Sequence, residues 1–329
     1  MTPVPAKTLQ IAEEIRSMRT RGAGRIACAA VQGLMIAAEE SRASTPEQLL
    51  EDVAQAARAL HNTRPSAVSL PNGLRYFFTR LEAKAKETTD TATIRQHARD
   101  IGQGFITMSN NAVKAIGQIG SRFIDDGDVI FTYCNSATAV EILITAHQMG
   151  KQFSVYVPET RPKYQGHISA TWLDDAGIAC CLITDNAIRY LMGHADKVFV
   201  GADAIAANGA VLNKIGTSMV ALAANEARLD FFVAAESYKF SPLTMLGELI
   251  QIEEREASEV VPTDQLASWK HVTVRNPAFD LTPPEYIDAI ITEQGQIPPQ
   301  GAISILYEQY GWFTSELALP WESHVPASS

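Results

Sequence analysis

The hydrophobic pattern of this chain changes near residue 123, and the two sides of that point predict different architectures. From Lys7 to Phe123, apolar residues recur every three or four positions, which is the spacing of amphipathic helices. The longest stripe comprises Ile94, Ala98, Ile101, Phe105, Met108, Ala112, Ile116, Ile119 and Phe123. Shorter stripes occur at Leu74–Leu81 and Ala54–Leu60. We therefore predict an N-terminal helical domain over residues 1–123.

Beyond Gly127, short apolar runs alternate with helix-period segments. The runs are Val129–Tyr133, Phe153–Val157, Ile178–Ile183, Lys197–Val200 and Phe231–Ala235. This alternation is typical of parallel strands joined by crossover helices. We expect residues 124–329 to form a doubly wound, Rossmann-like α/β domain with a mostly parallel sheet. Ligands in such sheets bind beyond the carboxyl ends of the strands, so those ends are the first place to look for chemistry.

Composition narrows the classes of partner. The 329 residues contain 27 Lys and Arg against 37 Asp and Glu, a net charge of −10, which disfavours binding to nucleic acid or to an anionic membrane. No run reaches the roughly 20 apolar residues of a membrane-spanning helix, and the start lacks a signal-peptide centre. We expect a cytoplasmic protein, whose local arginines and backbone amides can still hold a small anion.

Two strand ends carry reactive side chains. Cys134 follows the first predicted strand and precedes a helix, whose N-terminal N–H groups lower the pKa of a nearby thiol and favour a thiolate. Asp203 follows the fourth strand, where a carboxylate is costly to bury unless it is paired or protonated. The alternatives are a small core residue at 134 and a turn-capping carboxylate at 203. We place Cys28, Cys180 and Cys181 in the core.

Other segments suit an anion. Asn208-Gly209 predicts a tight turn, and Asn213 and Lys214 then precede another helix. In the helical half, glycines flanked by arginines over Arg21–Arg25 allow close backbone approach to a phosphate. The same sequence is also compatible with an ordinary turn between helices. The X-Pro pairs at Arg64 and Arg161 are also compatible with plain turns.

Together these segments resemble the family that contains initiation factor 2B regulatory subunits, methylthioribose-1-phosphate isomerase and archaeal ribose-1,5-bisphosphate isomerase. The resemblance covers nearly the whole chain, to Trp312. The motifs that carry it are Glu159–Gly166, Gly201–Asp203, Asn208–Thr217 and Asn276–Glu285. Arg21–Gly24, Thr63–Asn72, Glu236–Phe240 and Met245–Leu249 are most similar to the ribose-1,5-bisphosphate isomerase branch.

The resemblance implies that Cys134 and Asp203 are the catalytic pair. It also implies substrate contacts from Arg21, Gly22, Ala23, Gly24, Arg25, Arg64, Ser136, Ala137, Thr138, Asn213, Lys214 and Lys239. One departure concerns a phosphate contact: the related isomerases read Cys-His-Ser-Lys, whereas this chain has Asn135 and Ala137 in place of the histidine and the lysine. The Cys-Asn pair is more similar to the methylthioribose branch.

The activity implied is an aldose–ketose isomerisation of ribose 1,5-bisphosphate to ribulose 1,5-bisphosphate. Asp203, protonated, would open the ring, and the Cys134 thiolate would move a proton from C2 to C1. No metal or redox cofactor is required. The resemblance further implies stimulation by AMP in nucleotide salvage, and a homo-oligomer built from dimers into a hexamer.

Two alternatives stay open at this stage. Methylthioribose-1-phosphate isomerase runs the same chemistry on a sugar with an apolar 5-position, whereas Arg21, Arg25, Arg64 and Lys239 favour a phosphate there. A noncatalytic initiation factor 2B-type subunit would act through protein contacts and would not need a Cys–Asp pair.

Overall fold

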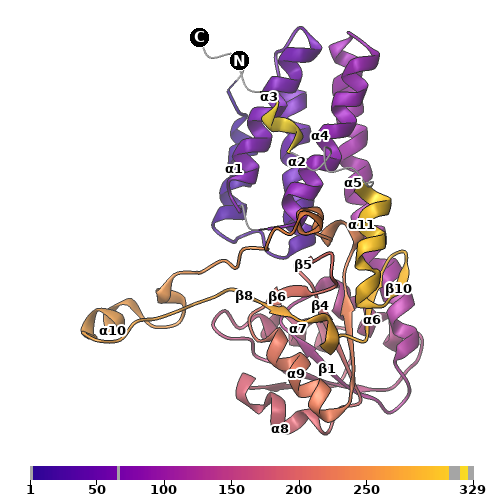
Figure 1. Cartoon of the computed structure of the whole chain (residues 1–329), viewed down its shortest axis with the longest axis vertical. Coiled ribbons are helices and arrows are strands. Elements are labelled where there is room, and N and C mark those ends of the chain that lie inside the picture. The colour runs from indigo at the N-terminus through magenta and orange to yellow at the C-terminus, as the bar shows by residue number, and fades with distance from the viewer. Residues whose placement is uncertain (1–2, 65–66, 311–318, 325–329) are drawn as a thin grey trace. The chain divides into compact units, whose positions relative to one another are not determined.

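The computed structural model describes residues 3–64, 67–310 and 319–324 and divides the chain into two compact units (Figure 1). One unit comprises Met1–Asn111 and Tyr310–Ser329, and the other comprises Ala112–Gln309. The division falls inside a long helix, before the boundary at residue 123 that periodicity suggests. None of the described helices combines the length and apolar content needed to cross a membrane.

The first unit is helical, and its helices meet through the apolar stripes of the sequence. Their bounds are α1 Ala6–Arg16, α2 Ala23–Glu40, α3 Pro46–His61, α4 Ser69–Glu87 and α5 Thr91–Gly120, the last continuing into the second unit. Leu34, Leu60 and Phe105 are fully buried. A Cβ on Gly102 would lie 2.1 Å from the sulfur of Met35. A helical glycine costs about 1 kcal/mol relative to alanine, and here it lets α5 and α2 approach closely.

The second unit is built on a seven-stranded sheet of order β10-β9-β7-β4-β1-β2-β3, in which only β10 is antiparallel to its neighbour. The strands are β1 Val129–Tyr133, β2 Ser154–Pro158, β3 Cys180–Ile183, β4 Lys197–Gly201, β7 Asp230–Ala234, β9 Ala289–Thr292 and β10 Gly295–Ile297. The chain moves outward from β1 in both directions, so the sheet is doubly wound, as predicted. The strand order reverses between β1 and β4.

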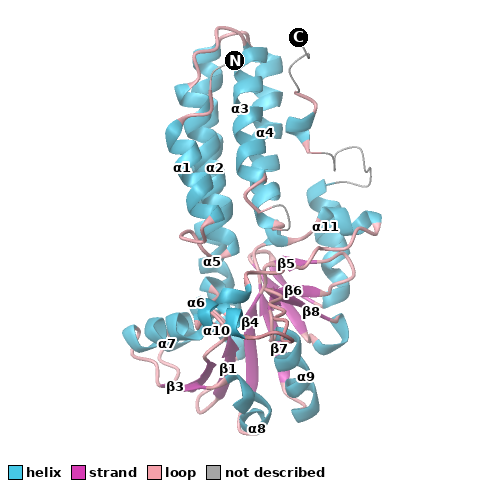
Figure 2. Cartoon of the chain, turned by 90° about the vertical axis from the view of Figure 1, so that its left-hand side faces the viewer, coloured by secondary structure: helices cyan, strands magenta, loops and turns pink. Residues whose placement is uncertain are grey.

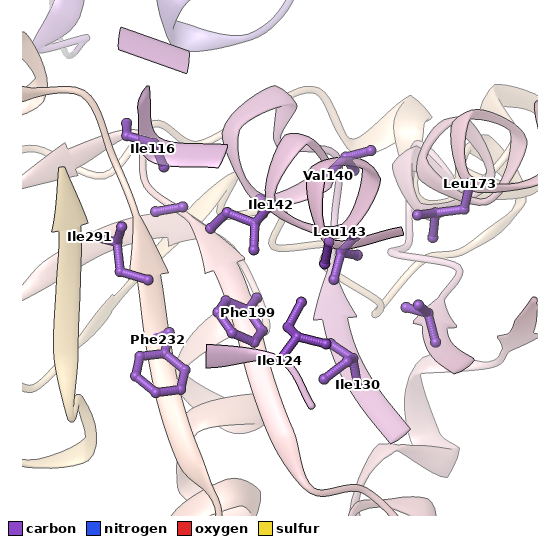
Figure 3. Close-up of a cluster of buried hydrophobic side chains, with 14 of the residues drawn as sticks. Ile116, Ile124, Ile130, Val140, Ile142, Leu143, Leu173, Phe199, Phe232 and Ile291 are labelled. Atoms are coloured by element: carbon purple, nitrogen blue, oxygen red, sulfur yellow. The ribbon is translucent and has the colours of Figure 1, made fainter. Parts of the chain in front are cut away.

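Helices cover both faces of this sheet. The helices of this unit are α6 Ala137–Gln148, α7 Gln165–Asp175, α8 Ile188–Met192, α9 Thr217–Ala227, α10 Thr263–Ser268 and α11 Ala302–Tyr310. Of these, α10 lies on an extended segment away from the sheet and has no buried residues (Figure 1). Helices α6 and α7 lie on one side of the sheet and α9 on the other (Figure 2). In the core, Ile142 and Leu143 of α6 lie over Phe199 of β4 and Ile130 of β1 (Figure 3). This packing fixes β1 beside β4, so the residues that follow the two strands meet at one edge of the sheet.

A small antiparallel sheet, which periodicity did not predict, adjoins this edge. It consists of β5 Ala204–Ile205, β6 Val211–Lys214 and β8 Phe279–Thr282, in the order β5-β6-β8. Gly209, at φ +84°, forms the predicted Asn-Gly turn between β5 and β6. Asn213 pairs with Asp280 and Lys214 with Phe279, so two motifs far apart in the sequence become neighbours.

Candidate active site

Cys134 directly follows β1 and has an unusual backbone conformation. Its φ is +64°, in the left-handed region that costs a residue with a β-carbon about 1–2 kcal/mol. Two side chains hold it there: the Cys134 N–H donates to Thr160 Oγ1 at 3.1 Å, and the Ser169 hydroxyl donates to the Cys134 carbonyl at 2.8 Å. The residue is 7% exposed. The thiol therefore occupies an enclosed and fixed position.

The ionisation of Cys134 differs from the expectation. Burial raises the pKa of the thiol to about 11; the charge of Lys214 and the backbone N–H of Asn135 oppose this shift, whereas Asp203 and Asp185 add to it. Helix α6 begins only at Ala137. The prediction that a helix N-terminus makes Cys134 a thiolate is therefore wrong for the free protein, because desolvation outweighs the helix.

The start of α6 packs tightly against the end of β4. Ser136 caps α6 by accepting from the Ala139 N–H at 3.2 Å, and its oxygen lies 3.0 Å from Thr138 Oγ1. A Cβ on Gly201 would lie 2.2 Å from Ser136 Oγ. Glycine at 201 thus allows the strand end before Asp203 to meet a helix N-terminus, a place that favours anions. Ala137 is exposed at this terminus.

Asp203 shares the site with Cys134. It follows the end of β4, it is half-buried, and its N–H donates to the Leu212 carbonyl at 2.9 Å. The strands that precede the two residues are paired neighbours. The charge of Asp203 contributes to the raised pKa of the Cys134 thiol. An acid and a thiol therefore lie at the point where the strand order reverses, the position at which doubly wound sheets bind ligands.

Asn213 and Lys214 are buried beside this point, 6% and 7% exposed. Asn213 Nδ2 donates to Thr217 Oγ1 at 3.1 Å, and that hydroxyl donates to the Lys214 carbonyl at 2.7 Å. The Lys214 ammonium lies 4.8 Å from the centroid of the Phe279 ring, within cation–π range. The cation is thus held near the thiol, whose pKa it lowers.

Asp280, in the last of the recognised motifs, braces the same segment. Its carboxylate accepts from the Gly216 N–H at 2.7 Å and the Ser218 N–H at 3.2 Å, at the start of α9. Burial raises the pKa of Asp280 to about 6, although the backbone N–H groups and Lys214 oppose the shift. The sequence motif alone gives Asp280 no role, because the pairing of β6 with β8 is invisible in a linear pattern.

Lys239 is a second buried cation. It lies in the 3₁₀ turn Ser237–Lys239, and its ammonium is 2.6 Å from Glu236 Oε2. Both side chains are almost fully buried, and the Tyr238 hydroxyl donates to Glu236 Oε1 at 3.0 Å. The carboxylate of Glu236, which sequence reasoning did not assign, thus compensates the charge of a predicted substrate contact.

Asn135 is a further candidate for a substrate contact. In the sequence it is notable only because it replaces the histidine of related isomerases. Its Nδ2 is buried and has no hydrogen-bond partner among the residues that the structure describes. Buried amides are almost always paired in native proteins. A donor of this kind, next to the thiol, is suited to a hydroxyl or phosphate oxygen of a bound sugar.

The remaining predicted contacts belong to the helical unit. Gly22, at φ +88°, precedes α2 without a side-chain cap, and Ala23, Gly24 and Arg25 form the first turn of α2 rather than a loop. Arg21 is exposed and donates to the Met18 carbonyl at 2.7 Å. An uncapped helix start flanked by arginines suits phosphate. Its part in a site with Cys134 stays a prediction.

Arg64 is buried in the same unit. Helix α4, which begins at Ser69, is tied to the start of α2, because the Ser69 hydroxyl donates to the Ala23 carbonyl at 2.9 Å. Arg64 and the Arg21–Arg25 turn therefore belong to connected parts of the helical unit. The contact of Arg64 with a substrate also stays a prediction.

The other cysteines partly depart from the expected core positions. Cys28 and Cys180 are half-buried, whereas Cys181 is exposed. The prediction for Cys181 is wrong because β3 is an edge strand of the sheet, and alternate side chains of an edge strand can face outward.

Comparisons with known proteins identify the family of this chain. The chain is 48% identical over 317 residues to ribose 1,5-bisphosphate isomerase of Pyrococcus furiosus, covering 96% of this chain and 98% of that protein. The structure of translation initiation factor eIF-2B from Pyrococcus horikoshii OT3 superposes with a TM-score of 0.77 at 33% identity, covering 91% of this chain and 99% of that one. The structure of 5-methylthioribose 1-phosphate isomerase from the same organism superposes with a TM-score of 0.76 at 33% identity. The match covers 92% of this chain and 88% of that one. A family model matches residues 19–299. The chain belongs to the initiation factor 2 subunit family.

Proposed function

We propose that this chain is an aldose–ketose isomerase that converts ribose 1,5-bisphosphate to ribulose 1,5-bisphosphate. The observation that carries the proposal is the placement of Cys134 and Asp203 after paired strands, at the reversal of strand order. The buried cations Lys214 and Lys239 suit an anionic substrate. The near full-length similarity to an enzyme of that name supports the choice of substrate.

Phosphate on C1 prevents the substrate from opening directly to a free aldehyde, so the ring must open by elimination. Asp203 donates a proton to the ring oxygen as the bond from C1 to that oxygen breaks, while Cys134 removes the hydrogen on C2. The C2–H electron pair becomes the C1–C2 double bond of an enol that keeps its phosphate. Cys134 then protonates C1, and the C2 hydroxyl returns a proton to Asp203 as the ketone forms.

The two residues need opposite protonation states, and one shared proton provides them. When that proton lies on Asp203, the carboxyl is the acid and the sulfur is the base. Burial raises the pKa of the free thiol to about 11 and Lys214 opposes the shift, so we expect Lys214 to stabilise the thiolate form of the pair. General acid–base steps of this kind contribute about 10²–10⁴-fold each.

The rival substrate is methylthioribose 1-phosphate, which lacks the second phosphate. Arg21, Arg25 and Arg64, together with the uncapped start of α2, favour a phosphate over an apolar 5-position. A noncatalytic regulatory subunit would not need a buried thiol beside a carboxyl group. Both residues are present here, which favours the enzyme.

The test is an NMR assay of the purified protein with the two sugars side by side. We expect ribose 1,5-bisphosphate to give ribulose 1,5-bisphosphate, with kcat/KM at least about 100-fold above that for methylthioribose 1-phosphate. Preference for the methylthio sugar would select the rival enzyme, and turnover of neither would favour the regulatory subunit.

The finer features implied by the resemblance remain part of this proposal. Adding AMP to the same assay tests for stimulation, and light scattering on the purified protein tests for a dimer-to-hexamer assembly. We also keep the expectation of a cytoplasmic enzyme.

A further inference from the structure

We propose that Thr160 is a positioning residue that holds the Cys134 thiol in place for proton transfer. This inference rests on the proposed function for the role of Cys134. It gives a function to the segment Glu159–Gly166, whose sequence is equally compatible with a plain X-Pro turn. Thr160 acts through the backbone of Cys134 and is not assigned a contact with the substrate.

The first step concerns the backbone of Cys134. This residue has a β-carbon yet adopts φ +64°, which isolated residues of this kind avoid. Its N–H donates to Thr160 Oγ1, while the Thr160 hydroxyl hydrogen is used on the Pro158 carbonyl at 3.2 Å. The Thr160 oxygen is therefore oriented as an acceptor. Ser169 of α7 donates to the Cys134 carbonyl, so both backbone groups of Cys134 are held by side chains.

The second step concerns Thr160 itself, which is also in the left-handed region, at φ +58°. Asp185 holds it by accepting from the Thr160 N–H at 2.8 Å and the Arg161 N–H at 2.7 Å. Thr160 is 1% exposed. Cys134, Thr160 and Asp185 follow β1, β2 and β3, which are three adjacent strands. Thr160 therefore holds Cys134, and Asp185 in turn holds Thr160.

The third step concerns how closely this segment is folded. The Gly166 N–H donates to the Glu159 carbonyl at 3.1 Å, and a Cβ on Gly166 would lie 1.8 Å from the Pro158 carbonyl oxygen. The segment therefore has little room to move the Thr160 hydroxyl. If that hydroxyl were lost, Cys134 could relax toward ordinary negative φ, which would rotate the Cα–Cβ bond and displace the sulfur. A displacement of about 1 Å can cost about 10²-fold in rate.

The experiment compares Thr160→Val, which removes the hydroxyl at nearly constant shape, with Thr160→Ser, which keeps it. We expect Thr160→Val to lower kcat about 10- to 100-fold with KM within about threefold, and Thr160→Ser to stay within about threefold of wild type in both. The matched control is Thr171→Val on α7, whose exposed hydroxyl bonds the His167 carbonyl of its own helix. This control should leave kcat unchanged.

A second readout does not depend on the isomerase reaction. We would measure alkylation of Cys134 by iodoacetamide against pH, without substrate, by mass spectrometry of its peptide. The wild-type rate should rise through a pKa of about 11. Thr160→Val should move that midpoint toward the ordinary thiol value of about 8.5 because the sulfur is less enclosed, and Thr160→Ser should not. If wild type alkylates as expected but does not isomerise the sugar, the proposed function fails while the role of Thr160 is still tested.

The inference would be overturned if Thr160→Val kept the wild-type kcat and the wild-type alkylation profile. It would also be overturned if Thr160→Val and Thr160→Ser lost kcat equally. If circular dichroism shows that Thr160→Val is unfolded, Ser169→Ala decides, because it removes only the bond to the Cys134 carbonyl. A kcat lowered at least about threefold at constant KM would then support positioning, and an unchanged kcat would overturn it.

Discussion

Two predicted substrate cations of the helical unit, Arg21 and Arg25, differ in burial from the two lysines of the α/β unit. In the helical unit, Arg21 and Arg25 are exposed beside an uncapped helix start. In the α/β unit, Lys214 and Lys239 are buried, the first against an aromatic ring and the second against a carboxylate. An exposed arginine costs the fold little, whereas a buried ammonium group must be compensated. We therefore predict that Arg21 and Arg25 serve substrate binding, and that the buried lysines contribute to both substrate binding and the stability of the fold.

The largest effects should come from Cys134 and Asp203, the proposed acid–base pair. Cys134→Ser and Asp203→Asn should each lower kcat by about 10³-fold or more, with bisphosphate affinity within a few-fold. Because one proton serves both residues, the double variant should be only slightly worse than either single variant. NMR turnover and titration calorimetry measure both quantities. Near-normal turnover in either single variant would remove that residue from the mechanism.

The next largest effect tests the buried side of the comparison. Lys239→Met leaves the Glu236 carboxylate buried without its partner, so the free energy of unfolding should fall by about 3–5 kcal/mol. KM should rise about 100-fold. Adding Glu236→Gln should restore most of the stability but not KM, as measured by urea unfolding and steady-state kinetics. Unchanged stability in Lys239→Met would contradict the assigned role of the ion pair.

A smaller effect tests the exposed side. Arg21→Met should raise KM about tenfold through the loss of a phosphate contact, with kcat unchanged. The free energy of unfolding should stay within about 0.5 kcal/mol of wild type because the side chain is on the surface. An unchanged KM would show that Arg21 does not contact the substrate, and a large loss of stability would undermine the contrast between the units.

The smallest effect concerns Asp280, the carboxylate that braces the Lys214 segment. Its pKa is raised to about 6 by burial, so the folded protein holds this proton more tightly than the unfolded chain does. Its contribution to stability therefore falls as pH rises from about 4 through 6. Relative to wild type, Asp280→Asn should gain on the order of 1 kcal/mol between pH 4.5 and 7.5. Urea unfolding of both proteins checks this, and a relative loss over that range would contradict it.

The strand ends were predictable because both signals there are local. The predicted run Val129–Tyr133 has the same bounds as β1. Cys134 directly follows β1, and Asp203 lies two residues beyond the end of β4. The ionisation of Cys134 was not predictable, because its burial depends on segments distant in the sequence. The helix signal is local and favoured the thiolate, but desolvation outweighs it.

Pairing between segments distant in the sequence explains the other features that the sequence pattern did not predict. β5 has only two residues, and β6 pairs with β8 across a long separation in the sequence, so the small sheet left no periodic signal. The role proposed for Thr160 was hidden for the same reason, because its partners Cys134 and Asp185 follow other strands. Local patterns thus predicted where the candidate reactive residues lie, while the groups that hold them come from tertiary structure.

The most direct measurement is a crystal structure of the Asp203→Asn variant with ribose 1,5-bisphosphate bound. The account predicts that Cys134 Sγ lies about 3–3.5 Å from C2 of the sugar, with the side chain at position 203 within hydrogen-bond distance of the ring oxygen. A sugar bound away from either side chain, in both open and closed arrangements of the protein, would contradict the account.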